Sequence, residues 1–198
     1  MTGSAEQMEI QERLKLIETM MAEGRRTTES WGWTFLLWGV AYYVAIAWST
    51  LGHSRIAWPV TMLTAAAVMS LPLARRQRSQ PETTMGRAIG SVWIAVGIAL
   101  FMILLSLGMS GRFDFHVFVG IVGALLGAAN AASGLILRWK MQMACAMVWW
   151  GAAVAACFGS ENTTLVAFLT AIFFCQIVFG IYGMVRASHK NEQDAAHA

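Results

Sequence analysis

The chain has 198 residues, of which 57% are hydrophobic and 13% are charged. Soluble domains carry roughly 25% charged residues, so this composition excludes an ordinary soluble domain and predicts an integral membrane protein. The net charge of +3 reflects where lysine and arginine lie between apolar runs. It gives no ground for inferring nucleic-acid binding.

The first segment in chain order is polar, and residues 4–23 are predicted to form an amphipathic helix. Ile10, Leu14, Ile17 and Met21 recur at helical spacing. The acidic residues around the rest of this helix argue against adsorption to anionic lipid. Two interpretations stay open for residues 1–29 as a cytoplasmic segment. The helix rests on the inner surface of the protein, or it docks a second copy of the chain or another membrane or cytosolic protein.

Six apolar runs follow, and each is about 18 to 25 residues long, the length that crosses ~30 Å of hydrocarbon. They predict an all-α membrane protein with six transmembrane helices arranged as three hairpins, a bundle over 30–187, and a disordered cytoplasmic tail over 188–198. The runs lie near 31–50, 56–74, 89–107, 115–137, 141–158 and 165–185.

Basic residues predict the orientation of these spans. Of the 14 lysines and arginines, 12 fall on one side of the predicted topology and only Arg55 and Arg112 fall on the other. Lysine and arginine accumulate in cytoplasmic loops. We therefore expect both termini in the cytoplasm, with the protein in a plasma membrane or a bacterial inner membrane.

Glycine is concentrated on one face of the fourth run. The spacing of three and four residues places Gly120, Gly123, Gly127, Asn130 and Gly134 on one seam. Such seams let helix backbones approach closely in a bilayer, where lipid supplies no hydrophobic drive between helices. Shorter seams occur in the third run, at Gly86, Gly90 and Gly97, and in the sixth, at Gln176, Gly180 and Gly183.

The hairpin pattern carries one loose resemblance. Trp38-Gly39, Trp93 to Gly97 and Trp150-Gly151 mark the hairpin entries, and the stretch VGIVGALLGAANAASGLIL is a glycine-rich exit. Together they resemble HdeD-type small six-helix membrane proteins. The resemblance covers the spans only and implies no functional residue.

The apolar runs contain no Asp, Glu, Lys or Arg, whereas pumps, ion-coupled carriers and voltage sensors normally need such groups within the membrane. Ser133, in Ala132-Ser133-Gly134, resembles the GxSG serine of rhomboid proteases. A serine nucleophile needs a base, and the sixth run contains no histidine. We therefore expect neither an enzyme nor a cofactor.

Four outer-loop residues are of the types that bind zinc, namely His53, Asp114, His116 and Glu161. Loop solvation explains each of them separately, so they are weak metal candidates.

Polar and aromatic residues inside the runs are the candidate binding residues: Asn130, Gln176, Ser133, Trp38, Tyr42 and Trp149. Asn130 and Gln176 lie at similar predicted depth on glycine-bearing seams. We expect these two amides to meet directly or through one water or ligand, because a buried amide without a partner is costly in hydrocarbon.

Two functions remain open. The first is a non-enzymatic interaction, regulatory or accessory membrane protein. The second is a subunit that binds or transports a small apolar or aromatic molecule with separate partners. The second would resemble the substrate-binding components of energy-coupling vitamin transporters, although the first run here is rich in Trp and Tyr rather than alanine.

Overall fold

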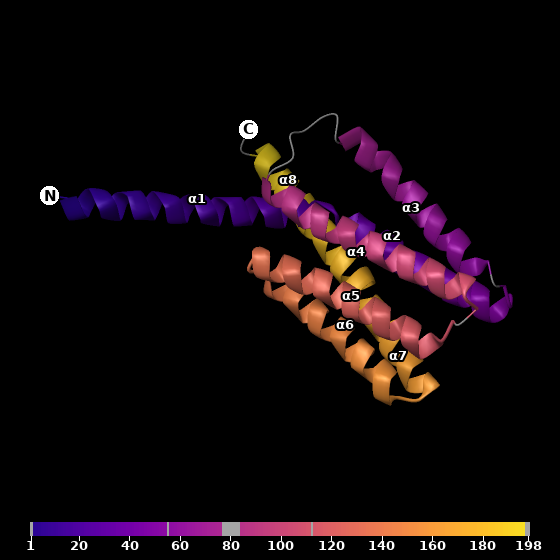
Figure 1. Cartoon of the computed structure of the whole chain (residues 1–198). Helices are drawn as coiled ribbons and strands as arrows, with labels where there is room; N and C mark the ends of the chain where they lie inside the picture. Colours follow the sequence, from indigo (N-terminus) through magenta and orange to yellow (C-terminus); the bar gives the residue numbers. More distant parts are fainter. Residues whose placement is uncertain (1, 55, 77–83, 112, 197–198) are drawn as a thin grey trace.

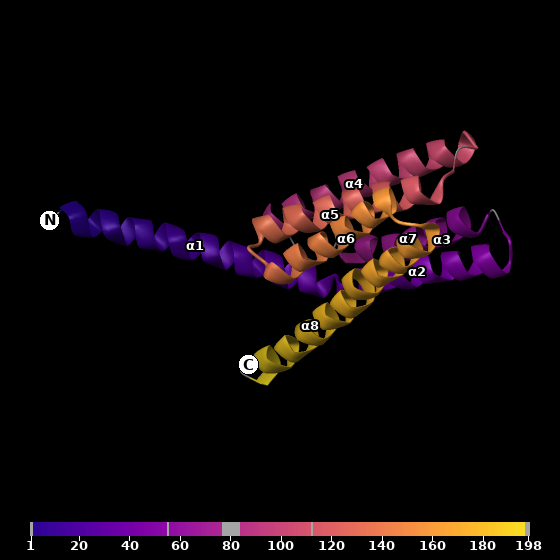
Figure 2. The ribbon, with the colours of Figure 1, turned by 90° about the horizontal axis from the view of Figure 1, so that it is seen from below.

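The computed structural model describes residues 2–54, 56–76, 84–111 and 113–196, and within them the protein is helical with no strand. The predicted all-helical fold is confirmed. The elements are α1 (Thr2–Ser30), α2 (Gly32–Leu51), α3 (Ala57–Arg76), α4 (Thr84–Met109), α5 (Phe115–Ile136), α6 (Lys140–Phe158), α7 (Glu161–Ile172), the π-helix η1 (Phe173–Val178) and α8 (Phe179–Ala196). Figures 1 and 2 show α2 to α8 as an elongated bundle with α1 projecting from one end.

Five described helices are long and apolar enough to cross a membrane: Gly32–Leu51, Thr84–Met109, Phe115–Ile136, Lys140–Phe158 and Glu161–His189. The predicted run at 56–74 differs from the others. It forms α3, but the apolar part described there is the shorter Ala57–Ser70. The basic connection at 77–83 lies outside the described residues.

The most extensive helix contact in the bundle is between α5 and α6, and the glycine seam explains why. A Cβ atom on Gly123 would lie 2.8 Å from the carbonyl oxygen of Trp149, and one on Gly134 would lie 3.0 Å from the backbone nitrogen of Met143. A Cβ on Gly127 would collide with the indole of Trp150. The predicted packing surface is confirmed at these three glycines. It is wrong at Gly120, which has no neighbour within 4 Å.

A second close approach joins the first and last spans. A Cβ on Gly32 of α2 would lie 2.6 Å from the carbonyl oxygen of Gly180 of α8, and a Cβ on Gly183 would lie 3.2 Å from the carbonyl oxygen of Glu29. Two turns farther along α2, Gly39 faces the side chains of Gln176 and Ile177 in η1. The seam predicted in the sixth run is therefore a contact surface for α2.

Helices α3 and α4 lie at the periphery. α3 packs against α2, and α4 packs against α5 and α1. The predicted seam in the third run holds at Gly90, where an added Cβ would lie 3.4 Å from the Trp31 ring, but Gly97 has no neighbour within 4 Å. The C-terminal half of α4 instead exposes large apolar side chains, including Ile98, Phe101 and Met102.

Helix α1 does not rest on the bundle along its whole length. Residues 9–19 are all exposed, and burial begins at Met21 and Gly24. A Cβ on Gly24 would touch side-chain atoms of Leu137 and Met85. The first part of α1 therefore stands clear of the bundle, as Figure 1 shows, and the interpretation of a helix lying on the inner surface is wrong for that part.

The last span is one long helical segment, α7–η1–α8, interrupted by six residues of π-helix. It continues as helix to Ala196, past residue 188 where a disordered tail was predicted. Both chain ends lie at the same end of the bundle in Figures 1 and 2. We call this the α1 end, and the opposite end, with the α2–α3, α4–α5 and α6–α7 connections, the far end.

Candidate functional site

Of the candidate aromatic residues, Tyr42 and Trp149 belong to the packed core, and the three do not surround one common pocket. Tyr42 and Trp149 both contact Phe168, with ring centroids 6.0 and 6.1 Å apart. Trp38 lies elsewhere, because its Nε1 donates to the sulfur of Met69 on α3 at 3.4 Å. The structure thus brings two of the three aromatic candidates together, through a phenylalanine that fills the space between them.

Ser133 is fully buried and serves as a hydrogen-bond acceptor between helices. Trp93 Nε1 of α4 donates to the Ser133 hydroxyl oxygen at 3.2 Å. The Trp93 ring in turn packs edge-on against Phe35, and Phe35 packs against Phe179, with centroids 5.2 and 5.1 Å apart. These contacts link α2, α4, α5 and α8 at the α1 end, which gives Ser133 a structural role.

The amides of Asn130 and Gln176 are both buried, but no direct hydrogen bond joins them. Asn130 Nδ2 donates to the Leu126 carbonyl of its own helix at 2.8 Å. Asn130 Oδ1 and Gln176 Oε1 each lack a hydrogen-bond partner. The predicted direct pairing is therefore wrong. It compared depth and assumed that both glycine-bearing seams face each other, whereas Gln176 packs on Gly39 of α2 and Asn130 lies on the seam that faces α6.

The interior holds a further amide that sequence reasoning missed. Gln142 in the first turn of α6 is 0% exposed, and neither its Oε1 nor its Nε2 has a hydrogen-bond partner. Trp149 Nε1, two turns along α6, also lacks one. Gln142 lies two residues after Lys140, and a polar residue at that position is typical of the end of a span. Its helical spacing to Cys145 and Trp149 was the available signal.

Cys145 and Cys175 fix how α6 faces η1. The Cys175 thiol donates to the Cys145 carbonyl oxygen at 3.5 Å, and both side chains are buried free thiols. Gln176 follows Cys175 directly, so it lies at the level of the α6 turn between Gln142 and Trp149.

The junction between α1 and the bundle carries an ion pair. Arg186 Nη1 of α8 lies 3.6 Å from Glu29 Oε1, whose side chain is only 10% exposed. The same arginine donates to the Tyr182 hydroxyl at 2.5 Å and stands 5.6 Å from that ring's centroid. The base of α1 is thus bound to α8 by charge as well as by the contact of Glu29 with Gly183.

The four metal candidates do not assemble. Among the described residues, no group of three or more His, Cys, Asp or Glu side chains could hold a metal ion. His116 Nδ1 lies 3.9 Å from Asp114 Oδ1. Asp114 caps α5 by accepting from Val117 N at 3.0 Å, and Glu161 lies in the first turn of α7. His53 lies in the α2–α3 connection with a φ of 47°.

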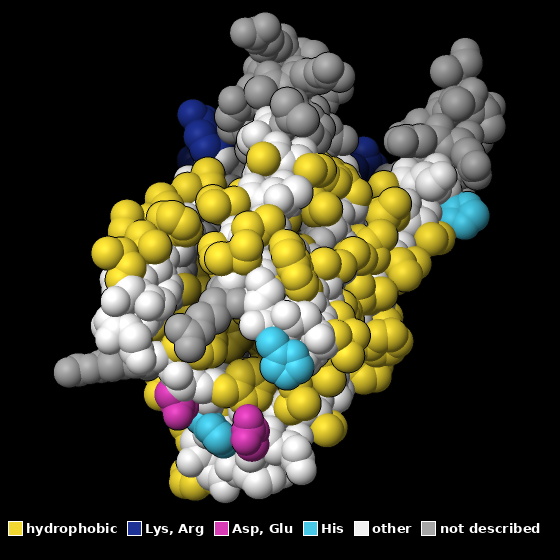
Figure 3. Space-filling model, turned by 90° about the vertical axis from the view of Figure 1, so that its right-hand side faces the viewer, with side chains coloured by type: hydrophobic (Ala, Val, Ile, Leu, Met, Phe, Trp, Pro, Cys, Tyr) yellow, Lys and Arg dark blue, Asp and Glu magenta, His cyan; other side chains and the backbone are white. Residues whose placement is uncertain are grey.

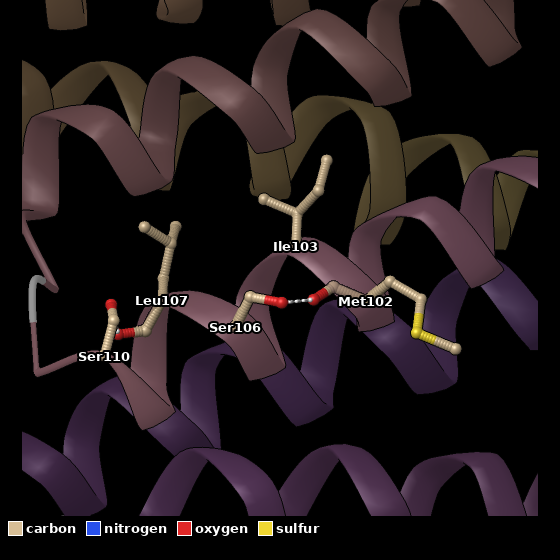
Figure 4. A pocket seen from close by; sticks show the side chains of 5 residues that line it. All are labelled: Met102, Ile103, Ser106, Leu107 and Ser110. Carbon is tan, nitrogen blue, oxygen red and sulfur yellow. Dashed lines mark hydrogen bonds between the residues drawn. The ribbon is translucent and has the colours of Figure 1, made fainter.

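The surface agrees with a membrane setting. In Figure 3, which looks at the far end, hydrophobic side chains cover much of the visible surface, and the visible Asp and Glu side chains lie beside a His side chain near the lower edge, while other His side chains lie apart. A shallow depression at the C-terminal end of α4 is lined by Met102, Ile103, Ser106, Leu107 and Ser110 (Figure 4). The Ser106 hydroxyl donates to the Met102 carbonyl of the same helix at 2.8 Å. This open, mostly apolar surface suits contact with lipid.

Comparison with protein-family models, with curated proteins and with solved structures finds no match for this chain.

Proposed function

We propose that the protein is a non-enzymatic, six-span integral membrane protein whose bundle anchors α1 as a cytoplasmic docking helix for a protein partner. The observation that carries this proposal is the exposed apolar stripe of α1. Ile10, Leu14 and Ile17 are 53%, 55% and 51% exposed on a helix that stands clear of the bundle.

The topology rests on the path of α3 and on charge. α3 has 20 residues, or ~30 Å of helix at 1.5 Å per residue, and it runs back beside α2 (Figure 1). A spanning α3 brings the chain back to the α1 end. Basic residues at that end, including Arg25, Arg87 and Arg138, are the kind that stay cytoplasmic. We assign the α1 end to the cytoplasm and the membrane to a plasma or bacterial inner membrane.

The apolar stripe is continuous with the part of α1 that packs on the bundle. Ile10, Leu14 and Ile17 are followed at the same spacing by Met21 and Gly24, which are buried. The same face of α1 therefore packs on the bundle near its C-terminal end and is exposed to solvent toward its N-terminal end. Most helical stability in proteins comes from tertiary packing of an amphipathic face, so a partner on the exposed stripe would stabilise this part of α1.

The charge of α1 favours a protein partner over a lipid surface. Residues 4–23 contain five glutamates and only two basic residues, Arg13 and Lys15. Interfacial helices that bind anionic lipid carry lysine and arginine on their polar face. An acidic helix beside an anionic leaflet is repelled, whereas a protein surface can match both the stripe and the glutamates.

The test is photo-crosslinking in native membranes from Leu14, with Glu12 on the opposite helix face as the matched control. We expect protein adducts from Leu14 and none from Glu12. Ile10→Glu should abolish the Leu14 adduct, and Thr19→Glu, on the opposite face, should leave it intact. Equal adducts from both faces, or lipid adducts alone from Leu14, would contradict a docking stripe.

A further inference from the structure

We infer that the bundle interior contains a hydration site, in which water bound between α5, α6 and η1 is held by the amides of Gln142, Asn130 and Gln176 and by the indole of Trp149. This inference concerns the interior of the bundle and is independent of α1 and its partner.

These four side chains share deep burial and unpaired polar atoms. Gln142 and Trp149 are 0% exposed, Asn130 is 2% exposed and Gln176 is 4% exposed. The unpaired atoms are Gln142 Oε1 and Nε2, Trp149 Nε1, Asn130 Oδ1 and Gln176 Oε1. Buried polar groups in folded proteins nearly always have a protein or water partner. Hydrocarbon around a bundle supplies no alternative.

Contacts between the helices place these groups along one stretch of α6. Gln142 and Trp149 are seven residues apart on its inward face, or about 10 Å. Cys175 bonds to the carbonyl of Cys145, between them, which brings η1 and Gln176 to that level. Gly134 of α5 packs against the backbone of Gln142 and Met143. Asn130, one turn from Gly134, therefore faces the same stretch from the other side.

The unpaired atoms identify the ligand by its chemistry. Gln142 Nε2 and Trp149 Nε1 donate, whereas the oxygens of Asn130, Gln142 and Gln176 accept, so the ligand must both donate and accept. An apolar molecule would leave all of these groups unpaired. A charged one would find no counter-charge, because the apolar runs contain no ionisable Asp, Glu, Lys or Arg. Water fits both conditions and is small enough for a close-packed core, where it typically makes about three hydrogen bonds.

The π-helix η1 explains why the Gln176 side chain lies at this site. A π segment inserts an extra residue into a helical turn and is frequently found at functional sites. Here the six π-helical residues include both Cys175, which bonds to α6, and Gln176, which packs on Gly39 of α2. The wider turn thus directs two successive side chains to two different neighbours, and it leaves the Gln176 amide oxygen inside the bundle.

The first test compares thermal unfolding of the purified full-length protein with that of Gln142→Met, a change that keeps the length and removes the amide. If water links Gln142 to the other groups, Tm should fall by several degrees, because their water loses a ligand. A dry, unpaired amide predicts the opposite, namely an unchanged or higher Tm. Gln11→Met, on the exposed part of α1, is the matched control and should leave Tm unchanged.

The second test is a density map of the wild-type protein that resolves water, which decides the question even if the variant fails to fold. We expect compact peaks within ~3.2 Å of Gln142 and of at least one other unpaired atom. An empty interior at that resolution would overturn the inference, whatever the Tm result. Elongated density would also overturn it, and would favour a bound small molecule and the alternative of a binding subunit.

Discussion

Single glycines decide how closely the helices of this bundle approach. Gly123 and Gly134 lie against backbone atoms of α6, and Gly32 and Gly180 lie against each other's backbone across α2 and α8. Backbone cannot rotate away as a side chain can, so an added methyl group at these positions must push a helix outward. Gly120 belongs to the same sequence pattern but faces open space. It therefore supplies a matched control on the same helix.

We predict that Gly123→Ala lowers the free energy of unfolding by about 1 to 3 kcal/mol, the usual cost of overpacking. Gly120→Ala should be neutral or stabilising by up to about 1 kcal/mol, because alanine is the better helix former. Thermal unfolding of both variants in the same detergent measures the difference. Equal effects would show that close approach of α5 and α6 does not depend on the seam.

The ion pair between Glu29 and Arg186 should matter modestly. Glu29 is nearly buried, but Arg186 remains 58% exposed and the closest atoms are 3.6 Å apart, so solvent screens the attraction. We expect Glu29→Gln to cost about 1 kcal/mol or less. Arg13→Gln breaks the exposed pair with Glu9 and should leave Tm unchanged. A loss from Arg13→Gln as large as that from Glu29→Gln would contradict this ranking.

At the scale of elements, α1 has two parts with different neighbours. Residues 9–19 are exposed, whereas Met21, Gly24, Thr28 and Glu29 are buried at the junction with the bundle. The spacing of apolar residues predicted the helix and its stripe. It could not predict at which residue α1 begins to pack on the bundle, because the same periodicity runs through the exposed part and the buried part. Only the position of the bundle distinguishes the two.

We predict that deleting residues 2–19 leaves Tm of the bundle unchanged and removes partner contact. Deleting residues 2–24 should lower Tm, because it also removes Met21 and Gly24 from the contact with α4 and the α5–α6 turn. The pair of deletions thus brackets the junction. A fall in Tm on the shorter deletion would show that the projecting part braces the bundle.

The seams show what sequence alone can and cannot establish about helix contacts. The 3/4 spacing correctly identified the glycine faces at Gly123, Gly127 and Gly134, and at Gly180 and Gly183, because small residues at that spacing have few other uses. The spacing could not show that Gly97 and Gly120 lack a helix contact, because the row of glycines continues past the point where the neighbouring helix is in contact. Direct contact between Asn130 and Gln176 could not be decided from depth and seam, because helical facing and the π segment, neither visible in the sequence, determine which neighbour an amide meets.

At the scale of the whole molecule, hydrophobicity predicted the helices within a few residues, apart from a last helix that continues to Ala196. The sequence did not reveal Gln142 as an interior residue, because its place beside Lys140 resembles a span boundary. The number of spans depends on the run at 56–74. The sequence predicts six spans, whereas five of the described helices are long and apolar enough to cross a membrane, and α3 is not among them. Five crossings would put the two termini on opposite sides of the membrane, and six put them on the same side.

The most direct test of a six-span protein with a cytoplasmic docking helix is cysteine labelling of intact cells, in a background without native cysteines. Single cysteines replace Glu12, on the face of α1 opposite the stripe, Asp114 and Ala195, and an impermeant thiol reagent is added outside. We predict labelling at position 114 alone, with positions 12 and 195 reacting only after permeabilisation. Labelling of position 12 or 195 from outside would contradict the topology and, with it, the assignment of α1 to a cytoplasmic partner.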